Sequence, residues 1–333
     1  MKFICSECGQ KYLLKDKNFR CNCGGLFKIP EHPLKYNTDL ELGEVKTPLL
    51  KKELAGQEVY YKLDYYQPTG SFKDRGARLM IGKLKNAGIK EIIEDSSGNA
   101  GAAVAAYSAA AGITCNIYLP ENTGSGKISQ IESTGAVIHK VPGDREATSR
   151  AIKIAAQNKY YASHIYNPLF FAGVATLAQE LIEDLQKIDK IILPVGNGSL
   201  LLGIWHGLKE LLPKNDIPKL IAVQATPVSP IWAEFYGECN YNTYSKNLAE
   251  GIAIKKPARK KEIVEAIRES NGDVILVTQS EIEATLKQLW RQGIYIEPTS
   301  AAAPAAAKKY FKNNHISTGN IVIILTGSGL KYK

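Results

Sequence analysis

The feature that most constrains this chain is a repeated alternation of short apolar segments with longer helical patterns. Apolar runs that predict strands occur near 91–94, 114–119, 137–141, 190–195, 219–224, 273–277 and 320–326. Helical patterns occur at about 100–112, 126–134, 145–158, 170–186, 199–212, 259–270, 279–292 and 299–312. Strands that alternate with helices predict an α/β protein in which the sheets are largely parallel.

The length and the charge distribution narrow the class of protein. With 333 residues, of which 44% are hydrophobic, the chain can bury a sizeable core and is expected to form about two domains. Its formal charge of +9 is spread over scattered lysine pairs rather than gathered in a basic block with aromatic residues. We therefore expect a solvated basic surface and no nucleic-acid partner.

The chain shows no sign of export or of membrane insertion. Met1 to Ile4 lead directly into Cys5 without an apolar signal region. No uninterrupted apolar run reaches the length of a membrane span, and the Ala-rich stretch 100–112 is too short for one. These observations predict a cytoplasmic protein with no membrane association.

Four of the six cysteines lie in the first 23 residues, as one Cys-x2-Cys pair and, twelve residues later, one Cys-x-Cys pair. In a reducing compartment such a cluster favours zinc over disulfides, because paired thiolates on two tight turns complete a tetrahedral site. The alternative is a small knuckle that has lost its metal, or that holds it only for stability. Residues 1–30 therefore predict a zinc-ribbon-like module whose candidate ligands are Cys5, Cys8, Cys21 and Cys23.

A lysine lies at the start of another predicted helix. Gln67-Pro68 and Gly70 predict a turn, and helix-compatible residues run from Asp74 to Lys85, so Lys73 lies at or near the helix start. The positive end of the helix dipole and partial burial both disfavour an ammonium group. They lower the pKa of a lysine, which suits an amine that attacks a carbonyl carbon. The alternative is a surface lysine that begins an amphipathic helix.

Two loops join predicted strands to predicted helices. Residues 95–101, Asp-Ser-Ser-Gly-Asn-Ala-Gly, place backbone N–H groups and two hydroxyls at a helix N-terminus, where a carboxylate or phosphate is favoured. Simple capping by Ser97 or Asn99 is the alternative. Residues 195–200, Val-Gly-Asn-Gly-Ser-Leu, form a glycine turn that lets the backbone approach a phosphate. A turn without a ligand is the alternative, and the spacing excludes a dinucleotide-binding fingerprint.

These stretches resemble motifs of one enzyme family. Residues 68–76, Pro-Thr-Gly-Ser-Phe-Lys-Asp-Arg-Gly, resemble the Schiff-base lysine motif of fold-type II pyridoxal-phosphate (PLP) enzymes, in the form found in threonine synthases. The two loops above are similar to the substrate-carboxylate loop and the PLP-phosphate loop of that family. Residues 325–331, Leu-Thr-Gly-Ser-Gly-Leu-Lys, resemble its C-terminal segment, with Ser328 in place of a histidine. The resemblance extends from about residue 45 to the end of the chain.

The resemblance implies a fold and a domain organisation. The expected fold is a two-domain α/β fold-type II PLP enzyme with parallel-rich three-layer sheets and a small Cys-rich knuckle at the N-terminus. Residues 31–84 and 166–333 then form a large PLP-binding domain, and residues 85–165 form an inserted small α/β domain. We expect a homodimer.

The resemblance also implies roles for individual residues. Lys73 forms the Schiff base with PLP and moves protons, Asn99 contacts the phenolic oxygen of the cofactor, and Thr326 faces the ring nitrogen. A neutral hydroxyl in that place favours elimination and replacement chemistry. The cofactor phosphate is assigned to Gly196, Asn197, Gly198, Ser199 and Leu200. The carboxylate of an amino-acid substrate is assigned to Ser96, Ser97, Gly98, Asn99 and Ala100.

One segment departs from the family pattern. Threonine synthases hold the phosphate of O-phospho-L-homoserine partly with an Asn-x-x-Asn-Pro-x-Arg segment, and this chain has His164 at the first position and Phe170 at the arginine position. An aromatic ring does not replace a bidentate phosphate ligand. Lys127 and His164 are the candidates to compensate.

Three functions therefore stay open. The first is a threonine synthase-like lyase that removes the γ-phosphate of O-phospho-L-homoserine and adds water to give L-threonine. The second is PLP-dependent β-elimination or β-replacement on an amino acid similar to serine, threonine or cysteine. The third is a non-catalytic zinc-ribbon binding protein on an enzyme scaffold.

Overall fold

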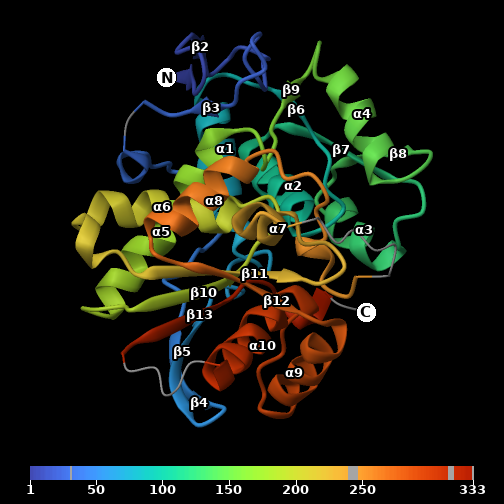
Figure 1. The fold of residues 1–333 in the computed structure, drawn as a ribbon. Helices are drawn as coiled ribbons and strands as arrows, with labels where there is room; N and C mark the ends of the chain where they lie inside the picture. The colour runs from blue at the N-terminus through green and yellow to red at the C-terminus, as the bar shows by residue number, and fades with distance from the viewer. Residues whose placement is uncertain (31, 239–246, 314–318, 332–333) are drawn as a thin grey trace. The chain divides into compact units, whose positions relative to one another are not determined.

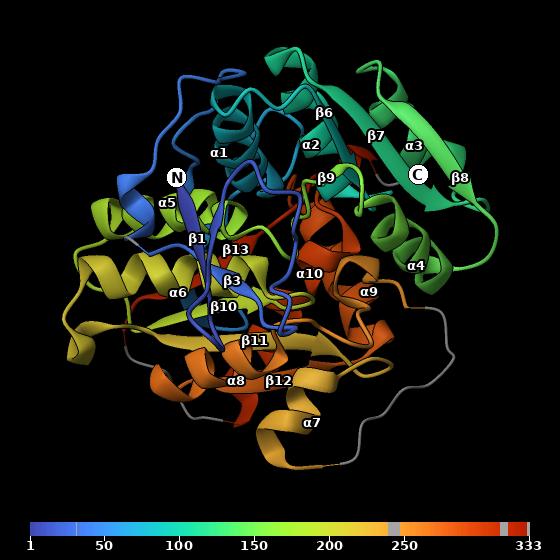
Figure 2. The ribbon, with the colours of Figure 1, turned by 90° about the horizontal axis from the view of Figure 1, so that it is seen from above.

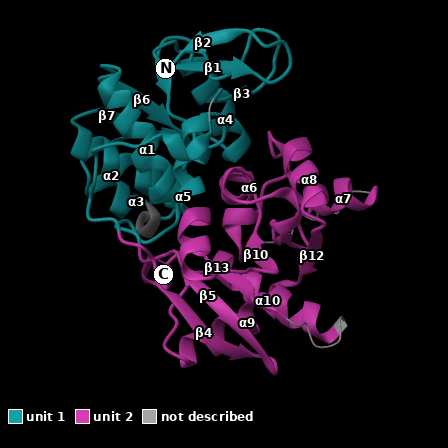
Figure 3. Ribbon diagram, turned by 90° about the vertical axis from the view of Figure 1, so that its left-hand side faces the viewer, with its two compact units in different colours: residues 1–44, 67–176 teal, residues 45–66, 177–333 magenta. Residues whose placement is uncertain are grey.

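The computed structural model describes residues 1–30, 32–238, 247–313 and 319–331. Within these ranges the chain forms two compact units, residues 1–44 with 67–176 and residues 45–66 with 177–333 (Figure 3). We refer to them as unit 1 and unit 2. The α/β class predicted from the sequence is confirmed, since parallel strands alternate with helices in both units.

Unit 2 is built on a six-stranded sheet with the order β12-β11-β10-β13-β5-β4, in which only the β4–β5 pair is antiparallel. Its strands are β4 (Leu49–Leu54), β5 (Gln57–Leu63), β10 (Lys190–Pro194), β11 (Lys219–Ala225), β12 (Asp273–Val277) and β13 (Ile321–Leu325). Its helices are α6 (Ser199–Leu211), α7 (Pro230–Tyr236), α8 (Lys260–Glu269), α9 (Gln279–Arg291) and α10 (Pro298–Asn313). Helices α6 and α8 lie on one face of the sheet and α9 and α10 on the other (Figure 1). Burial of both faces explains why the central strands are apolar throughout.

The Ala-rich sequence of α10 allows this helix to pack closely on the sheet. Its alanines between residues 301 and 307 are buried, and the helix contacts β10, β11, β12 and β13. Small side chains permit this short separation between helix and strands. The helix predicted at about 299–312 is therefore confirmed.

Unit 1 contains a parallel four-stranded sheet with the order β8-β7-β6-β9 (Figure 2). Its elements are β6 (Glu91–Glu94), β7 (Thr114–Pro120), β8 (Val137–Val141), β9 (Tyr160–Tyr161), α1 (Lys73–Asn86), α2 (Asn99–Ala111), α3 (Ser125–Glu132) and α4 (Arg145–Ala155). The Cys-rich segment adds a small antiparallel sheet of β1 (Lys2–Cys5), β2 (Lys11–Leu13) and β3 (Phe27–Lys28). Helix α5 (Pro168–Asp184) contains the boundary between the units.

The helices and strands follow the sequence pattern closely, whereas the domain division remains a prediction. The predicted inserted domain, residues 85–165, lies wholly within unit 1, which also contains residues 1–44, 67–84 and 166–176. Compactness alone does not establish which segments fold independently. Sequence patterns missed β1, β2, β3, β9 and α7, which are short, and β4, an edge strand whose residues are mostly exposed or half-buried. No helix in the described ranges combines the length and apolar character that a membrane span requires.

A buried lysine joins β5 to the C-terminal half of α5 within unit 2. Lys62 is fully buried, and its Nζ lies 2.9 Å from Glu180 Oε2, 2.9 Å from Asp184 Oδ2 and 2.7 Å from the Thr47 carbonyl oxygen. Thr47 in turn donates its N–H to Glu180 Oε2 at 3.1 Å. These contacts stabilise the segment that leads into β4 and β5.

We expect Lys62→Met to destabilise the protein by about 3–5 kcal/mol, because two carboxylates would lose their buried cationic partner. Urea unfolding measures the change in the free energy of unfolding. Lys51→Met is the matched control on β4, since Lys51 pairs with Glu58 at the surface and should contribute at most about 1 kcal/mol. Equal effects of the two substitutions would contradict this account.

Candidate active site

The predicted site residues divide between the two units. Lys73, the loop 96–100 and His164 belong to unit 1, whereas the loop 196–200 and Thr326 belong to unit 2. Lys127 lies in α3, but its side chain is not among those that the structure describes. We therefore describe each part of the site within its own unit.

Lys73 is the first residue of α1, as the sequence predicts. Its Nζ lies 4.7 Å from the ring centroid of Phe72 and 5.6 Å from that of Phe170, and the residue is half-buried. The loop before it is held by buried Asp74, which accepts hydrogen bonds from Thr69 N at 2.6 Å and Thr69 Oγ1 at 2.5 Å. These contacts favour the interpretation that the Lys73 amine is held in place over the alternative of a solvated surface lysine.

Phe170 is fully buried and occupies a notch in α1. A Cβ atom on Gly76 would lie 2.4 Å from Phe170 Cδ1, so only glycine permits this contact. The side chain at the family's arginine position is therefore an aromatic ring that packs beneath the start of α1, near Lys73. The segment 161–171 contains no lysine or arginine.

The loop 95–101 leaves β6 and begins α2. The N-cap residue is Gly98, and no side chain caps the helix, so the alternative of simple capping by Ser97 or Asn99 does not describe this loop. A Cβ atom on Gly101 would lie 1.8 Å from the Ser96 carbonyl oxygen, which shows how tightly the loop is folded against the helix. Ser96 to Asn99 are half-buried at the N-terminus of α2, the end of a helix that favours an anion.

A buried acid–imidazole pair lies at the end of β6. Glu94 Oε1 and His164 Nδ1 are 2.5 Å apart, and Glu94 Oε2 has no hydrogen-bond partner among the described residues. Burial raises the pKa of the Glu94 carboxyl to about 8, although positive charge on Lys73 acts in the opposite direction. Burial, assisted by Lys73, lowers the pKa of His164 to about 3. At neutral pH both groups are therefore uncharged, and His164 offers hydrogen bonding but no positive charge.

A second acidic side chain extends this pair. The Tyr161 hydroxyl donates a hydrogen bond to Asp95 Oδ1 at 2.5 Å. Burial, followed by repulsion from Glu94, raises the pKa of Asp95 to about 6. Sequence reasoning did not identify Glu94, Asp95 or Tyr161. The sequence signal that could have identified them is the pair of consecutive acidic residues, Glu94 and Asp95, at the end of a buried strand.

In unit 2, the loop 195–199 joins β10 to α6. Gly198 is the N-cap of α6 with φ +86°, and a Cβ atom there would lie 2.4 Å from Ile263 Cδ1. No side chain caps this helix and its first turn contains no acidic residue. An uncapped helix N-terminus without acidic residues favours a phosphate, and Gly196, Asn197, Ser199 and Leu200 complete the loop.

Thr326 is buried after β13 and is positioned by Ser300 of α10. Ser300 Oγ accepts hydrogen bonds from Thr326 N at 2.9 Å and Gly327 N at 2.7 Å and lies 3.0 Å from Thr326 Oγ1. With two N–H groups donating to Ser300 Oγ, the Ser300 hydroxyl hydrogen can go to Thr326 Oγ1 or to the Gly327 carbonyl oxygen 3.1 Å away, and the Thr326 hydroxyl hydrogen can go to another acceptor. An unprotonated ring nitrogen is such an acceptor. Ser300 thus holds the Thr326 turn, a role that the sequence did not reveal.

The donor set fits the predicted cofactor. Lys73 supplies an amine, the start of α6 supplies phosphate-binding N–H groups, and Thr326 supplies a hydroxyl donor. In addition, Ser71 Oγ, two residues before Lys73, is buried without a hydrogen-bond partner among the described residues. Such an atom in a polar loop is typical of a place where a ligand binds.

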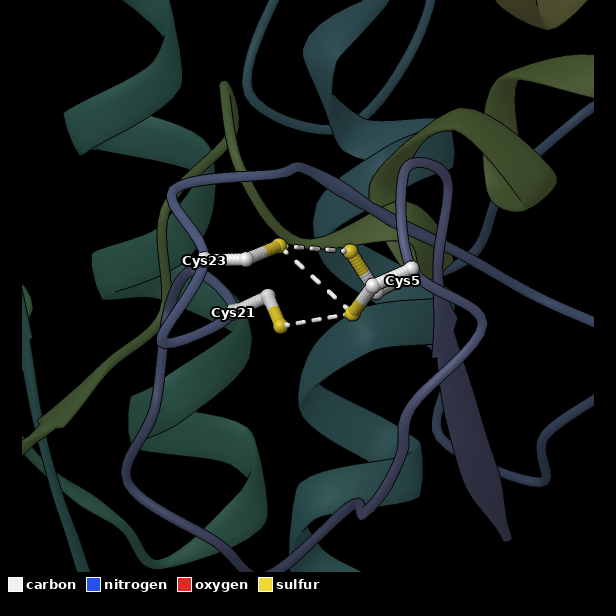
Figure 4. Close-up of side chains that lie close together, drawn as sticks. Cys5, Cys21 and Cys23 are labelled. Atoms are coloured by element: carbon white, nitrogen blue, oxygen red, sulfur yellow. Dashed lines mark hydrogen bonds between the residues drawn. The ribbon is translucent and has the colours of Figure 1, made fainter.

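The four N-terminal cysteines are brought together in unit 1, with neighbouring sulfur atoms 3.5 Å apart (Figure 4). Cys5 and Cys21 are buried, whereas Cys8 and Cys23 are exposed. Their side chains form a cluster separate from the residues described above.

Comparisons with known proteins identify the relatives of this chain. A family model described as "Pyridoxal-phosphate dependent enzyme" matches residues 40–327. A threonine synthase of Methanocaldococcus jannaschii is 32% identical over 98% of this chain and 92% of its own length. A threonine synthase of Halalkalibacterium halodurans is 34% identical over 88% of this chain and 84% of its own length. A solved structure of serine racemase from Dictyostelium discoideum covers 85% of this chain and 92% of that one, with 31% identity and a TM-score of 0.74.

The Glu94–His164 pair predicts how stability depends on pH. Unfolded Glu94 ionises near its ordinary pKa of 4.5 while the native pKa is about 8, so stability should fall as pH rises between these values, by at most about 1.4 kcal/mol per pH unit. His164 acts in the opposite direction, because its pKa is about 3 in the native protein and 6.5 ordinarily. As pH falls below about 6.5, the unfolded chain takes up a proton at His164 before the native protein does, and the free energy of unfolding decreases. Glu94→Gln should therefore flatten the decline between about pH 6.5 and 8.

Urea unfolding at several pH values measures this decline in the wild type and the variant. Glu91→Gln on the same strand is the matched control, because Glu91 is exposed and its pKa is lowered by Lys159. A slope in Glu94→Gln equal to that of the wild type would show that Glu94 is not the titrating group.

Proposed function

Because the chain belongs to the pyridoxal-phosphate dependent enzyme family, we propose that it catalyses β-elimination or β-replacement on a small, unphosphorylated amino acid similar to serine or threonine. Enzymes of this family act through PLP. The proposed elimination or replacement is the same kind of chemistry as the reaction of the threonine synthase relatives. Membership of an enzyme family leaves little support for a non-catalytic binding protein.

The residues of each unit have separate tasks in this proposal. When bound, PLP withdraws electrons from the amino acid attached to it. Lys73 holds the cofactor and moves the proton at Cα, while the loop 96–100 binds and orients the substrate carboxylate. The loop 196–200 holds the cofactor phosphate at the start of α6. Thr326 donates its hydroxyl hydrogen to the ring nitrogen, which keeps that nitrogen uncharged.

The observation that carries the choice of substrate is buried Phe170, which packs near Lys73 in the place of an arginine. A phosphate dianion needs cationic or multiple N–H ligands, and a phenyl ring provides neither. His164 does not compensate through charge, because burial holds its pKa at about 3. Both side chains instead suit a substrate whose leaving group is small and weakly charged.

The threonine synthase reaction on O-phospho-L-homoserine is the second candidate. It is favoured by the two relatives named as threonine synthases, which are similar to this chain over most of their length. It requires a phosphate ligand from elsewhere. Lys127 keeps that role as a prediction.

Parallel assays with the purified holoenzyme distinguish these reactions. We expect ammonia and a 2-oxo acid from L-serine or L-threonine, or replacement when a thiol is added, and no phosphate from O-phospho-L-homoserine. Release of phosphate together with L-threonine, without ammonia from either hydroxy amino acid, would instead establish the second candidate.

Lys73→Ala should lower turnover of the accepted substrate by at least about 10²–10⁴-fold, because the proton-moving group is lost. Borohydride should no longer attach the cofactor to the chain, which peptide mass spectrometry measures. Lys85→Ala is the matched control near the other end of the same helix, where the side chain is exposed, and it should keep activity and covalent attachment. Attachment that persists in Lys73→Ala would show that another lysine carries the cofactor.

A further inference from the structure

The arrangement of the four N-terminal sulfur atoms carries information that the enzyme reaction does not use. Cys5 and Cys23, Cys8 and Cys21, and Cys8 and Cys23 each have their sulfur atoms 3.5 Å apart, and all four lie within 4.8 Å of one another. A disulfide would place two sulfurs about 2.05 Å apart. Four zinc–sulfur bonds of about 2.3 Å in a tetrahedron place them about 3.8 Å apart. The observed separations agree with a metal site and not with disulfides.

The backbone around the cysteines is folded as tight turns that point donors at the sulfurs. Glu7 donates its N–H to Cys5 Sγ at 3.4 Å, and the Tyr12 hydroxyl donates to Cys21 Sγ at 3.3 Å. A Cβ atom on Gly25 would lie 2.5 Å from Cys5 Sγ, so the second turn approaches the first as closely as glycine permits. Hydrogen bonds to sulfur stabilise the thiolate form that binds a metal.

We propose that Cys5, Cys8, Cys21 and Cys23 bind one zinc ion that fixes the loop between the two cysteine pairs against β9 and the segment after it. Four protein ligands leave no open position, so the site is structural rather than catalytic. A tetrahedral set of four thiolates also accepts iron. Zinc is our assignment, and metal analysis separates the two metals.

The loop between the cysteine pairs makes specific contacts within unit 1. The Phe19 ring lies 5.5 Å from the ring of Tyr161 and 5.2 Å from that of Tyr166, and the Arg20 guanidinium lies 5.2 Å from the Tyr166 ring. Lys17 Nζ donates to the Asn158 carbonyl oxygen at 2.7 Å. The metal closes this loop at both ends, at Cys8 and Cys21, so it reduces the conformational freedom of Phe19 and Arg20.

These contacts connect the metal cluster to the candidate active site. Tyr161 donates its hydroxyl hydrogen to Asp95, which precedes the carboxylate-binding loop, and β9 pairs with β6 at Ile93 and Tyr161. His164 lies three residues beyond Tyr161 and contacts Glu94. The cysteine module thus acts as a brace for the segment 160–166, and its effect on the reaction is one of positioning.

Metal analysis of the full chain, purified without added metal and then supplied with Zn²⁺ alone, tests the first part. We expect about one zinc per chain in the wild type and at least about a fivefold loss in Cys8→Ser and in Cys23→Ser. Both cysteines are exposed, so these substitutions leave the core packing intact. Ser6→Ala, in the same turn, is the matched control and should keep its zinc. The assignment would be overturned if the wild type held less than a tenth of this zinc or held iron in its place. It would also be overturned if both cysteine variants kept their zinc.

A second measurement does not depend on the variants. The metal-free wild type should give the intense charge-transfer spectrum of a tetrahedral four-thiolate site on addition of Co²⁺, and Zn²⁺ should remove it. Hydrogen–deuterium exchange of the holoenzyme before and after chelation then tests the brace. We expect faster exchange in residues 2–28 and 160–166 and unchanged exchange in β10. Unchanged exchange in 160–166 after confirmed loss of zinc would overturn the positioning role.

Discussion

The parallel pairing of the strands is the constraint on which the chemistry of this chain depends. In a parallel sheet every strand must return by a crossover, so each strand ends at a turn that leads towards a helix. The turns after β6 and β10 lead into α2 and α6, whose N-termini no side chain caps. The turn after β13 holds Thr326 through two N–H donors to Ser300. Glycine is required at positions 196, 198 and 327 because a Cβ atom there would collide with neighbouring backbone or side-chain atoms.

In the function that we propose, substrate choice depends on burial around the start of α1 rather than on these turns. Phe170 occupies the space that Gly76 leaves, and His164 is paired with Glu94 in surroundings that disfavour charge on either group. Positive charge on Lys73 lowers the pKa of both titratable groups. A buried neutral acid beside a neutral imidazole is suited to hydrogen bonding with an uncharged leaving group, and poorly suited to a phosphate. This contrast explains why similarity to threonine synthases does not by itself identify the substrate.

The cysteine module is too small to be stabilised by its own core alone. Three short strands bury few apolar side chains, so such a segment depends on a metal or on contacts with a larger body. Here the structure shows sulfur atoms at metal-binding separations and aromatic contacts from Phe19 to Tyr161 and Tyr166. The aromatic contacts connect the module to the strand pair β6–β9, which carries Glu94 and leads into the loop 95–101.

The sequence by itself determined the features that depend on local patterns. Apolar periodicity located nearly all the long helices and most strands of the two large sheets, and turn residues placed Lys73 at a helix start. Cysteine spacing identified four side chains that the fold brings together. The tertiary structure alone decided which remote residues meet: Glu94 with His164, 70 positions apart, and Ser300 with Thr326, 26 positions apart. Local sequence could not predict these pairs or their pKa shifts, because burial by distant segments sets the dielectric surroundings of each group.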